Sequence, residues 1–151
     1  DVINSLKKNK PIILRNPSAT RPWQHVLEPL SGYLLLGSKL INKELKKNLD
    51  PNWNFGPPLK NCKKVKNIVE LFVKNWGNKN QKILLKKNIK YHESKLLSLN
   101  TNKAKKELNW QAQLSLEETI KFTVDWYKIY FLSKNEAENI SNYQIEYYIN
   151  K

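Results

Sequence analysis

Two arginines and their spacing are the feature of this sequence that most directly suggests chemistry. The chain has 27 basic residues, of which 25 are Lys, and the only two Arg are Arg15 and Arg21. The sequence is also rich in Asn, with 20 of them, a bias in which Lys is the default cation. Arg is favoured over Lys where a planar guanidinium must bind an oxyanion through two parallel hydrogen bonds. We therefore expect an oxyanion site in this stretch; the alternative is two arginines in a structural loop.

The other reactive side chains form no recognisable catalytic or metal-binding pattern. His25 and His92 belong to no His-x-x-x-His or Cys-x-x-Cys spacing, so no metal site is predicted. The single Cys62 lies between Asn61 and two lysines and is best interpreted as an incidental surface thiol. The four glycines are isolated, at positions 32, 37, 56 and 77, so there is no Gly-rich phosphate loop. The sequence predicts no self-sufficient active site.

A strand and a helix are predicted on either side of the arginines. Residues 11–14 read as a short buried strand that leads into Arg15. A helix is predicted from Pro29, because apolar residues recur at spacings of three and four, at Leu30, Tyr33, Leu34, Gly37, Leu40 and Ile41. Pro29 suits a first helical turn, and Glu28 beside it complements the positive end of the helix dipole. Residues 21–25 would then precede a helix N-terminus, where backbone N–H groups can receive a phosphate.

Short strands and helices alternate along the rest of the chain. Strands are predicted at 53–55, 83–85 and 89–99, and helices at 65–76 and 101–108, ending at Gly77 and at a left-handed Asn109. Ser115-Leu-Glu-Glu118 is a capping box that opens the strongest helix, and a short helix is predicted at 143–149. The expected fold class is α/β, or α+β, with too few strands for a complete doubly wound sheet.

The net charge of +14 raises the possibility of a nucleic-acid partner. Residues 1–106 carry 23 basic and 6 acidic residues, a charge of +17, whereas residues 107–151 carry 4 and 7, a charge of −3. The lysines are spread along the chain in pairs and do not alternate with aromatic residues, as a base-stacking surface would require. We therefore expect solvated surfaces and no nucleic-acid partner; a basic polyanion-binding module is the alternative.

Length and composition indicate one cytoplasmic domain. A chain of 151 residues fits a single domain, and one cysteine excludes an internal disulfide. The longest apolar runs are too short to span a bilayer, and no signal peptide opens the sequence, so no membrane partner is expected. The sequence contains no Met, even at position 1, so we expect a piece of a longer protein that lacks its N-terminal part.

The stretch around the two arginines resembles a known enzyme family. Arg15-Asn-Pro-x-Ala-x-Arg-Pro-Trp-Gln-His-Val-Leu-Glu-Pro-Leu-x-Gly-Tyr33 is similar to the corresponding segment of CDP-glucose 4,6-dehydratases, which are extended short-chain dehydrogenases/reductases. Further motifs follow in the family's order: Trp53-Asn-Phe-Gly-Pro57, Val69-Glu70, Trp76-Gly77, His92-Glu93, Lys103-Ala104, Leu108-x-Trp110, Thr123-Val-x-Trp-Tyr127, Gln144-Ile145 and Tyr147. The resemblance covers essentially all 151 residues. The chain departs from the pattern in Leu99-Asn-Thr-Asn-Lys103 and at Asn109, where the family often has Asp, Ser and Gly.

The resemblance implies a fold and a reaction. It implies that residues 1–151 are the C-terminal substrate-binding part of an extended short-chain dehydrogenase/reductase, with the N-terminal Rossmann sheet absent. The reaction is an NAD-dependent, redox-neutral loss of water from CDP-glucose: hydride leaves C4, water leaves across C5 and C6, and hydride returns to C6. The NAD site and the catalytic residues would belong to the missing N-terminal domain, so this chain alone is expected to be inactive. A homodimer or larger assembly is implied for the full-length enzyme, and a sister nucleotide-sugar epimerase or dehydratase is a further alternative.

The resemblance also implies which residues contact the substrate. Arg21 matches the arginine that contacts the substrate's diphosphate in related enzymes. The same motif places Arg15, Gln24 and His25 near the phosphates or the nucleotide. His92 and Glu93 fall where relatives have another nucleotide-contacting segment. Three tryptophans, Trp53, Trp110 and Trp126, are expected in the core.

Overall fold

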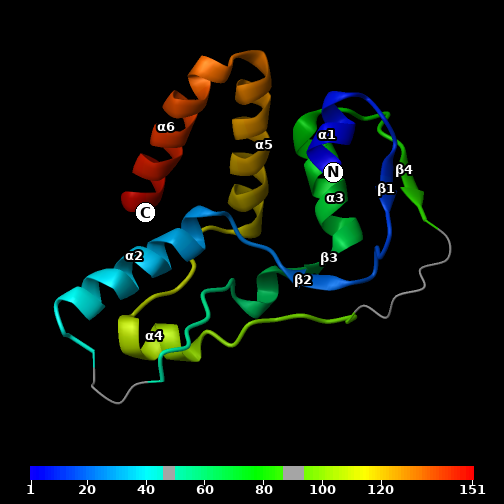
Figure 1. The fold of residues 1–151 in the computed structure, drawn as a ribbon. Helices are drawn as coiled ribbons and strands as arrows, with labels where there is room; N and C mark the ends of the chain where they lie inside the picture. The colour runs from blue at the N-terminus through cyan, green and yellow to red at the C-terminus, as the bar shows by residue number, and fades with distance from the viewer. Residues whose placement is uncertain (46–49, 87–93) are drawn as a thin grey trace.

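The computed structural model describes residues 1–45, 50–86 and 94–151 and confirms the α/β class (Figure 1). Its helices are α1 (Val2–Lys7), α2 (Leu27–Ile41), α3 (Val65–Trp76), α4 (Asn102–Leu108), α5 (Leu116–Leu132) and α6 (Ala137–Ile149), with 3-10 turns at Leu59–Asn61 and Lys134–Glu136. Its strands are β1 (Ile12–Leu14), β2 (Thr20–Pro22), β3 (Cys62–Lys64) and β4 (Ile83–Leu85). None of the helices in these ranges combines the length and apolar composition needed to cross a membrane.

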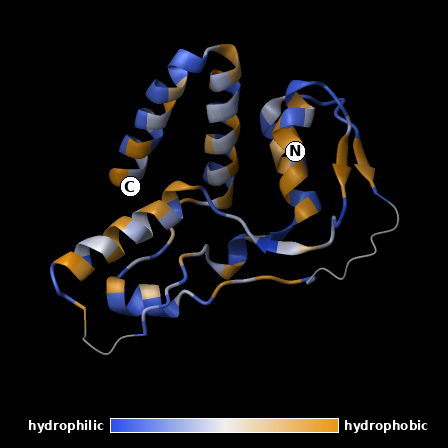
Figure 2. Ribbon diagram, viewed as in Figure 1, coloured by the Kyte–Doolittle hydropathy of each residue, from blue (hydrophilic) through white to orange (hydrophobic). Residues whose placement is uncertain are grey.

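The four strands form two small sheets. β1 and β4 are parallel, with Ile12 opposite Ile83, and α1 and α3 pack against one face of the pair. The other face is open, since Ile13 is 62% exposed, although both strands are apolar (Figure 2). β2 and β3 form an antiparallel ribbon that places Arg21 opposite Lys63. A third segment joins this ribbon, because Thr20 N–H donates to Lys95 O and Thr20 O accepts from Leu97 N–H.

Helix α5 packs against α3 and forms an inverted V with α6 (Figure 1). Ile68 of α3 is buried in one cluster with Leu116, Ile120 and Val124 of α5. The predicted capping box is confirmed: Ser115 Oγ accepts from Glu118 N–H, and Glu118 Oε2 accepts from Ser115 N–H. The helix stops at Gly77 and Asn109 are also confirmed, with φ of 88° and 55° in the left-handed region.

Helix α2 buries one side and leaves an apolar side open. On its buried side, Gly32 packs against Phe55 so closely that a Cβ would lie 2.3 Å from the phenyl ring. On its open side, Tyr33, Leu34 and Ile41 are 59%, 77% and 81% exposed. The apolar residues that were predicted to share a face do so, and within the described part of the chain most of that face stays exposed, although the ring of Tyr33 meets Phe55 edge-on at 5.5 Å. Large exposed apolar patches mark interaction surfaces.

Several sequence predictions of local structure are wrong. Residues 53–55 form no strand, because no described segment pairs with their backbone; Phe55 packs instead with Leu108 and Trp110. The strand predicted at 89–99 is reduced, in its described part 94–99, to one bridge at Leu96, and residues 87–93 lie outside the described ranges. Helix α6 begins at Ala137 rather than at 143. The ribbon of β2 and β3, which includes Cys62, was missed because neither three-residue strand shows apolar alternation.

The capping box predicts a measurable contribution to stability. Replacing Ser115 by Ala removes the acceptor for Glu118 N–H, and we expect the free energy of unfolding to fall by about 1 kcal/mol in urea titrations at pH 7. Ser38→Ala, at an exposed interior position of α2, is the matched control and should leave stability unchanged or slightly higher. Equal stability of the two variants would contradict the role assigned to Ser115.

Candidate functional site

Arg21 lies at the junction of the β2–β3 ribbon and the segment that begins at Ser94. Its side chain is half-buried, and Nη1 donates to Thr20 O and to Ser94 O, both at 2.9 Å. Arg15 is exposed, immediately after β1. His92 and Glu93 lie outside the described residues. The structure places Arg21 against Ser94, the first described residue after them.

Gln24 and His25 lie between the ribbon and α2. Gln24 Nε2 donates to Phe55 O at 3.0 Å, which fixes the amide against the 53–56 segment. His25 is 7% exposed, and its ring meets the ring of Phe122 edge-on at 5.7 Å. Burial lowers the pKa of His25 below its ordinary value, because an imidazolium would lose its hydration there. His25 is therefore neutral at pH 7. Its role in the candidate site is to pack against its neighbours, and it adds no positive charge.

The expectation of a phosphate site at the N-terminus of α2 is wrong. The N–H of Leu27 donates to His25 Nδ1 at 3.4 Å, and the N–H of Glu28 donates to His25 O at 3.1 Å. Pro29 has no N–H, and the N–H of Leu30 bonds to Val26 O. The donors of the first turn are thus used within the protein. Arg21 lies in β2 and not beside the helix.

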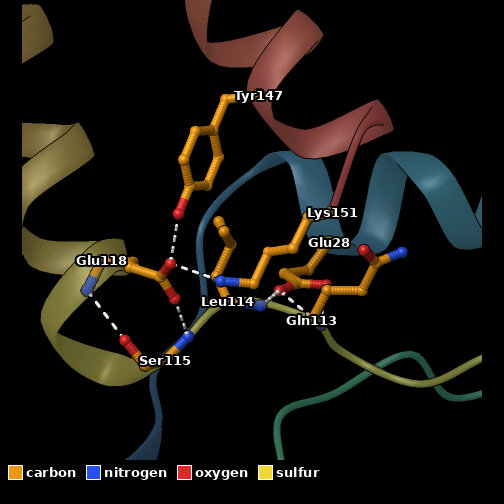
Figure 3. Close-up of polar contacts among 7 residues, drawn as sticks. All are labelled: Glu28, Gln113, Leu114, Ser115, Glu118, Tyr147 and Lys151. Carbon is orange, nitrogen blue, oxygen red and sulfur yellow. Dashed lines mark hydrogen bonds and ion pairs between the residues drawn. The ribbon is translucent and has the colours of Figure 1, made fainter.

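Glu28, four residues after Gln24, has a structural role that the sequence did not reveal. Its side chain is 1% exposed, and Oε1 accepts from the backbone N–H of Gln113 at 2.9 Å and of Leu114 at 2.6 Å (Figure 3). Oε2 accepts from the hydroxyl of Tyr148 at 2.8 Å. Burial, with Glu28 as a further cause, raises the pKa of Tyr148 to about 12, which keeps that hydroxyl protonated. Glu28 therefore ties the segment that follows Arg21 to the start of α5 and to α6.

A second carboxylate, Glu118 of α5, contacts the C-terminal end of α6 and Lys151 beyond it (Figure 3). Glu118 Oε1 accepts from Tyr147 Oη at 2.7 Å and forms an ion pair with Lys151. Lys151 first, and then Tyr147 and Ser115 N–H, lower the pKa of Glu118 to about 2. The carboxylate stays ionised across the physiological range, so its own contacts with Tyr147 and Lys151 do not depend on its titration there.

The described residues contain no group of three His, Cys, Asp or Glu side chains placed to hold a metal ion. Cys62 is half-buried in β3, and burial raises the pKa of its thiol in spite of the neighbouring lysines.

Trp110 is buried, as expected, whereas Trp53 and Trp126 are half-buried. Trp126 lines a cavity between α5 and α6. Gln24 and His25 line the same cavity.

Comparison with known proteins confirms the resemblance. The chain is 39% identical over 128 residues to the CDP-glucose 4,6-dehydratase of Salmonella typhimurium, an alignment that covers 85% of this chain. The chain spans 35% of that relative's length. No protein-family model matches the chain.

Solved structures confirm the fold. The dTDP-glucose 4,6-dehydratase of Bacillus anthracis in complex with NAD matches 89% of the chain with a TM-score of 0.67 and 22% identity, and the match covers 38% of that enzyme. The UDP-glucuronic acid 4-epimerase of Bacillus cereus in complex with NAD matches 86% of the chain and 37% of the enzyme, with a TM-score of 0.66 and 20% identity. At this level of identity the likeness establishes the fold alone.

The bonds of Glu28 predict a strong effect of a nearly isosteric substitution. Glu28→Gln keeps the shape but turns an NH₂ group toward a donor that the carboxylate satisfied, and leaving a buried donor unpaired costs about 1–3 kcal/mol. We expect the free energy of unfolding to fall by that amount. Glu117→Gln is the control, because Glu117 is exposed in the first turn of α5, and it should change the free energy of unfolding little. If both variants unfold at the same urea concentration, Glu28 does not hold these elements together.

Burial of His25 predicts that stability depends on pH between 7.5 and 5.5. The folded-state pKa lies below the ordinary value of 6.5, so the unfolded chain takes up the proton first and stability falls as pH drops through 6.5. We expect the unfolding free energy to be lower at pH 5.5 than at pH 7.5. His25→Gln should flatten this slope. A slope that persists in His25→Gln would assign it to another group.

Proposed function

We propose that residues 1–151 are the C-terminal, nucleotide-sugar-binding domain of an NAD-dependent CDP-glucose 4,6-dehydratase, a lyase that forms CDP-4-keto-6-deoxyglucose. The main support is the 39% identity to a CDP-glucose 4,6-dehydratase over 85% of the chain. The solved structures of nucleotide-sugar dehydratases and epimerases share the fold. The chain spans 35–38% of the length of these proteins, which supports the proposal of one domain within a larger enzyme.

In this proposal Arg21 binds the diphosphate of the substrate. The two carbonyl contacts of Nη1 fix the plane of the guanidinium before the substrate arrives, and such preorganisation lowers the entropy cost of binding. Arg15, exposed at the end of β1, adds a second positive charge on the same motif. Gln24 and His25 shape the nucleotide side of the site. His92 and Glu93 contact the nucleotide, as the family resemblance implies.

NAD would be bound by a domain that precedes this chain. The residues of this chain do not fit the cofactor, because its four glycines are isolated and two of them, Gly32 and Gly37, lie inside α2. When bound in the complete enzyme, NAD accepts a hydride from the sugar and returns it. The residues of this chain bind and orient the substrate, so the chain alone should not dehydrate CDP-glucose when NAD is added.

The exposed apolar surfaces support the presence of a covering domain. The open side of α2 and the open face of the β1–β4 pair carry large apolar side chains, among them Leu34 and Ile13. Burying such surface contributes about 25 cal/mol per Å², so both surfaces favour contact with a further domain. We propose that the complete enzyme is a cytoplasmic homodimer or larger assembly.

Two other functions make different predictions. A basic module that binds nucleic acid or another polyanion would depend on many lysines together and would lose affinity steeply with salt. A sister nucleotide-sugar epimerase or dehydratase would keep the role of Arg21 and differ in its preference for the base. The resemblance to a CDP-glucose enzyme favours the CDP-glucose assignment over both.

Arg21→Lys in the complete enzyme tests the proposal while preserving the charge. Loss of a bidentate hydrogen bond to a charged group should weaken CDP-glucose binding by about 1.5–3 kcal/mol, roughly a 10- to 150-fold rise in Kd measured by calorimetry. Lys63→Ala is the matched control, because Lys63 lies directly opposite Arg21 in the ribbon, and it should change Kd little. An unchanged Kd in Arg21→Lys, or an equal loss in Lys63→Ala, would contradict the assignment of Arg21.

A further inference from the structure

The ribbon that carries Arg21 brings further positive charge to the same face. Arg21 lies in β2, and Lys63 of β3 lies directly opposite it in the antiparallel register. Two residues that are directly opposite each other in an antiparallel pair project to the same face of the sheet. Lys63 and Arg21 are therefore neighbours on one face of the ribbon.

A third segment adds Lys95 to this face. Thr20 lies opposite Leu96 in a parallel bridge. The bridge is closed on both sides, because Thr20 N–H donates to Lys95 O and Thr20 O accepts from Leu97 N–H. Side chains alternate between the two faces along a strand, so Lys95 projects away from the Thr20 face and toward the face of Arg21.

The charges of the two lysines are not neutralised by the protein around them. Lys63 and Lys95 are exposed, and neither forms an ion pair with a residue in the ranges that the structure describes. β2, β3 and residues 94–97 contain no Asp or Glu. By contrast, Lys66 in the first turn of α3 is paired with Glu70. The Arg21 face therefore presents positive charge to solvent.

Exposed charges around a binding site act mainly on the rate of association. A surface of one sign attracts an oppositely charged ligand over about 10 Å at about 0.1 M salt and can raise the encounter rate by roughly 10- to 1,000-fold. A buried, hydrogen-bonded contact acts mainly on the rate of dissociation. The exposed lysines and the half-buried Arg21 should thus affect different rate constants.

We propose that Lys63 and Lys95 steer the anionic substrate toward Arg21 and so set the rate at which it binds. The inference rests on the proposed function, in which Arg21 binds the diphosphate of CDP-glucose. The guanidinium holds the diphosphate, whereas the two ammonium groups attract it during its approach and form no fixed contact with it. This division agrees with the small change in Kd expected for Lys63→Ala alone.

Two double variants of the complete enzyme remove the same charge from different places. Lys63→Gln with Lys95→Gln neutralises the steering pair. Lys79→Gln with Lys82→Gln neutralises two exposed lysines beyond the C-terminal end of α3. Helix α3 begins where β3 ends, and its 12 residues span about 18 Å, so the control pair is well separated from the ribbon (Figure 1).

Stopped-flow tryptophan fluorescence with CDP-glucose gives the association and dissociation rate constants. At about 20 mM NaCl, we expect the Lys63–Lys95 variant to associate about fivefold more slowly and to dissociate at a rate within about twofold of the natural enzyme. At about 500 mM NaCl the difference should shrink below about twofold, because salt screens exposed charges. The control variant should associate within about twofold of the natural enzyme at both salt concentrations. Calorimetry checks the result independently, since slower association alone raises Kd by the same factor.

Three results would overturn the steering role. Equal slowing in the control variant would assign the effect to overall charge, as a general polyanion-binding module requires. A change confined to the dissociation rate constant would make the lysines direct contacts of the substrate. Association by the natural enzyme that does not slow as salt is added would exclude steering altogether. If the complete enzyme binds no CDP-glucose at either salt concentration, the proposed function itself fails, and this outcome is distinct from the other three.

Discussion

The arrangement of the helices depends on the buried carboxylate of Glu28. A carboxylate that leaves water needs several donors, and here two backbone N–H groups and one phenol provide them. Residues 113 and 114 lead directly into the capping box of α5, so their attachment to Glu28 fixes where α5 begins. Tyr148 attaches α6 to the same group. The Arg21 segment, α5 and α6 thus share one anchor, and the cavity between the two helices exists because both are held to it.

The accuracy of sequence prediction followed the range of the interactions. The capping box at Ser115 and the left-handed residues Gly77 and Asn109 were predicted correctly because each depends on a few neighbouring residues. The strand at 53–55 was wrong because a strand requires a partner elsewhere in the chain. Glu28 shows most clearly that long-range contacts were not predictable from the sequence. Its position beside Pro29 indicated only a favourable contact with the helix dipole, whereas its actual partners are 85 to 120 residues away.

The sequence predicted which residues belong to the candidate site but not how they are arranged. The scarcity of Arg singled out the segment whose Arg21 contacts Ser94 in the structure. The local geometry was not predictable. His25 uses both its ring and its carbonyl to satisfy the first N–H groups of α2, and no spacing rule shows that a His two residues before a helix will do so. The orphan oxygen of Gln24 is likewise visible only once Phe55 is in place.

The bond between Tyr148 and Glu28 joins residues separated by 120 positions, which has a consequence for the order of folding. Because the entropy cost of closing a loop grows with its length, we expect α6 to dock after α5 and the ribbon have formed. During synthesis the Glu28 carboxylate leaves the ribosome long before its phenolic partner does. Until then it remains hydrated, and the segment that carries Arg21 is free to sample other conformations. Helix α6, although it lies about 120 positions further along the chain, is therefore the element that completes the contacts of Glu28.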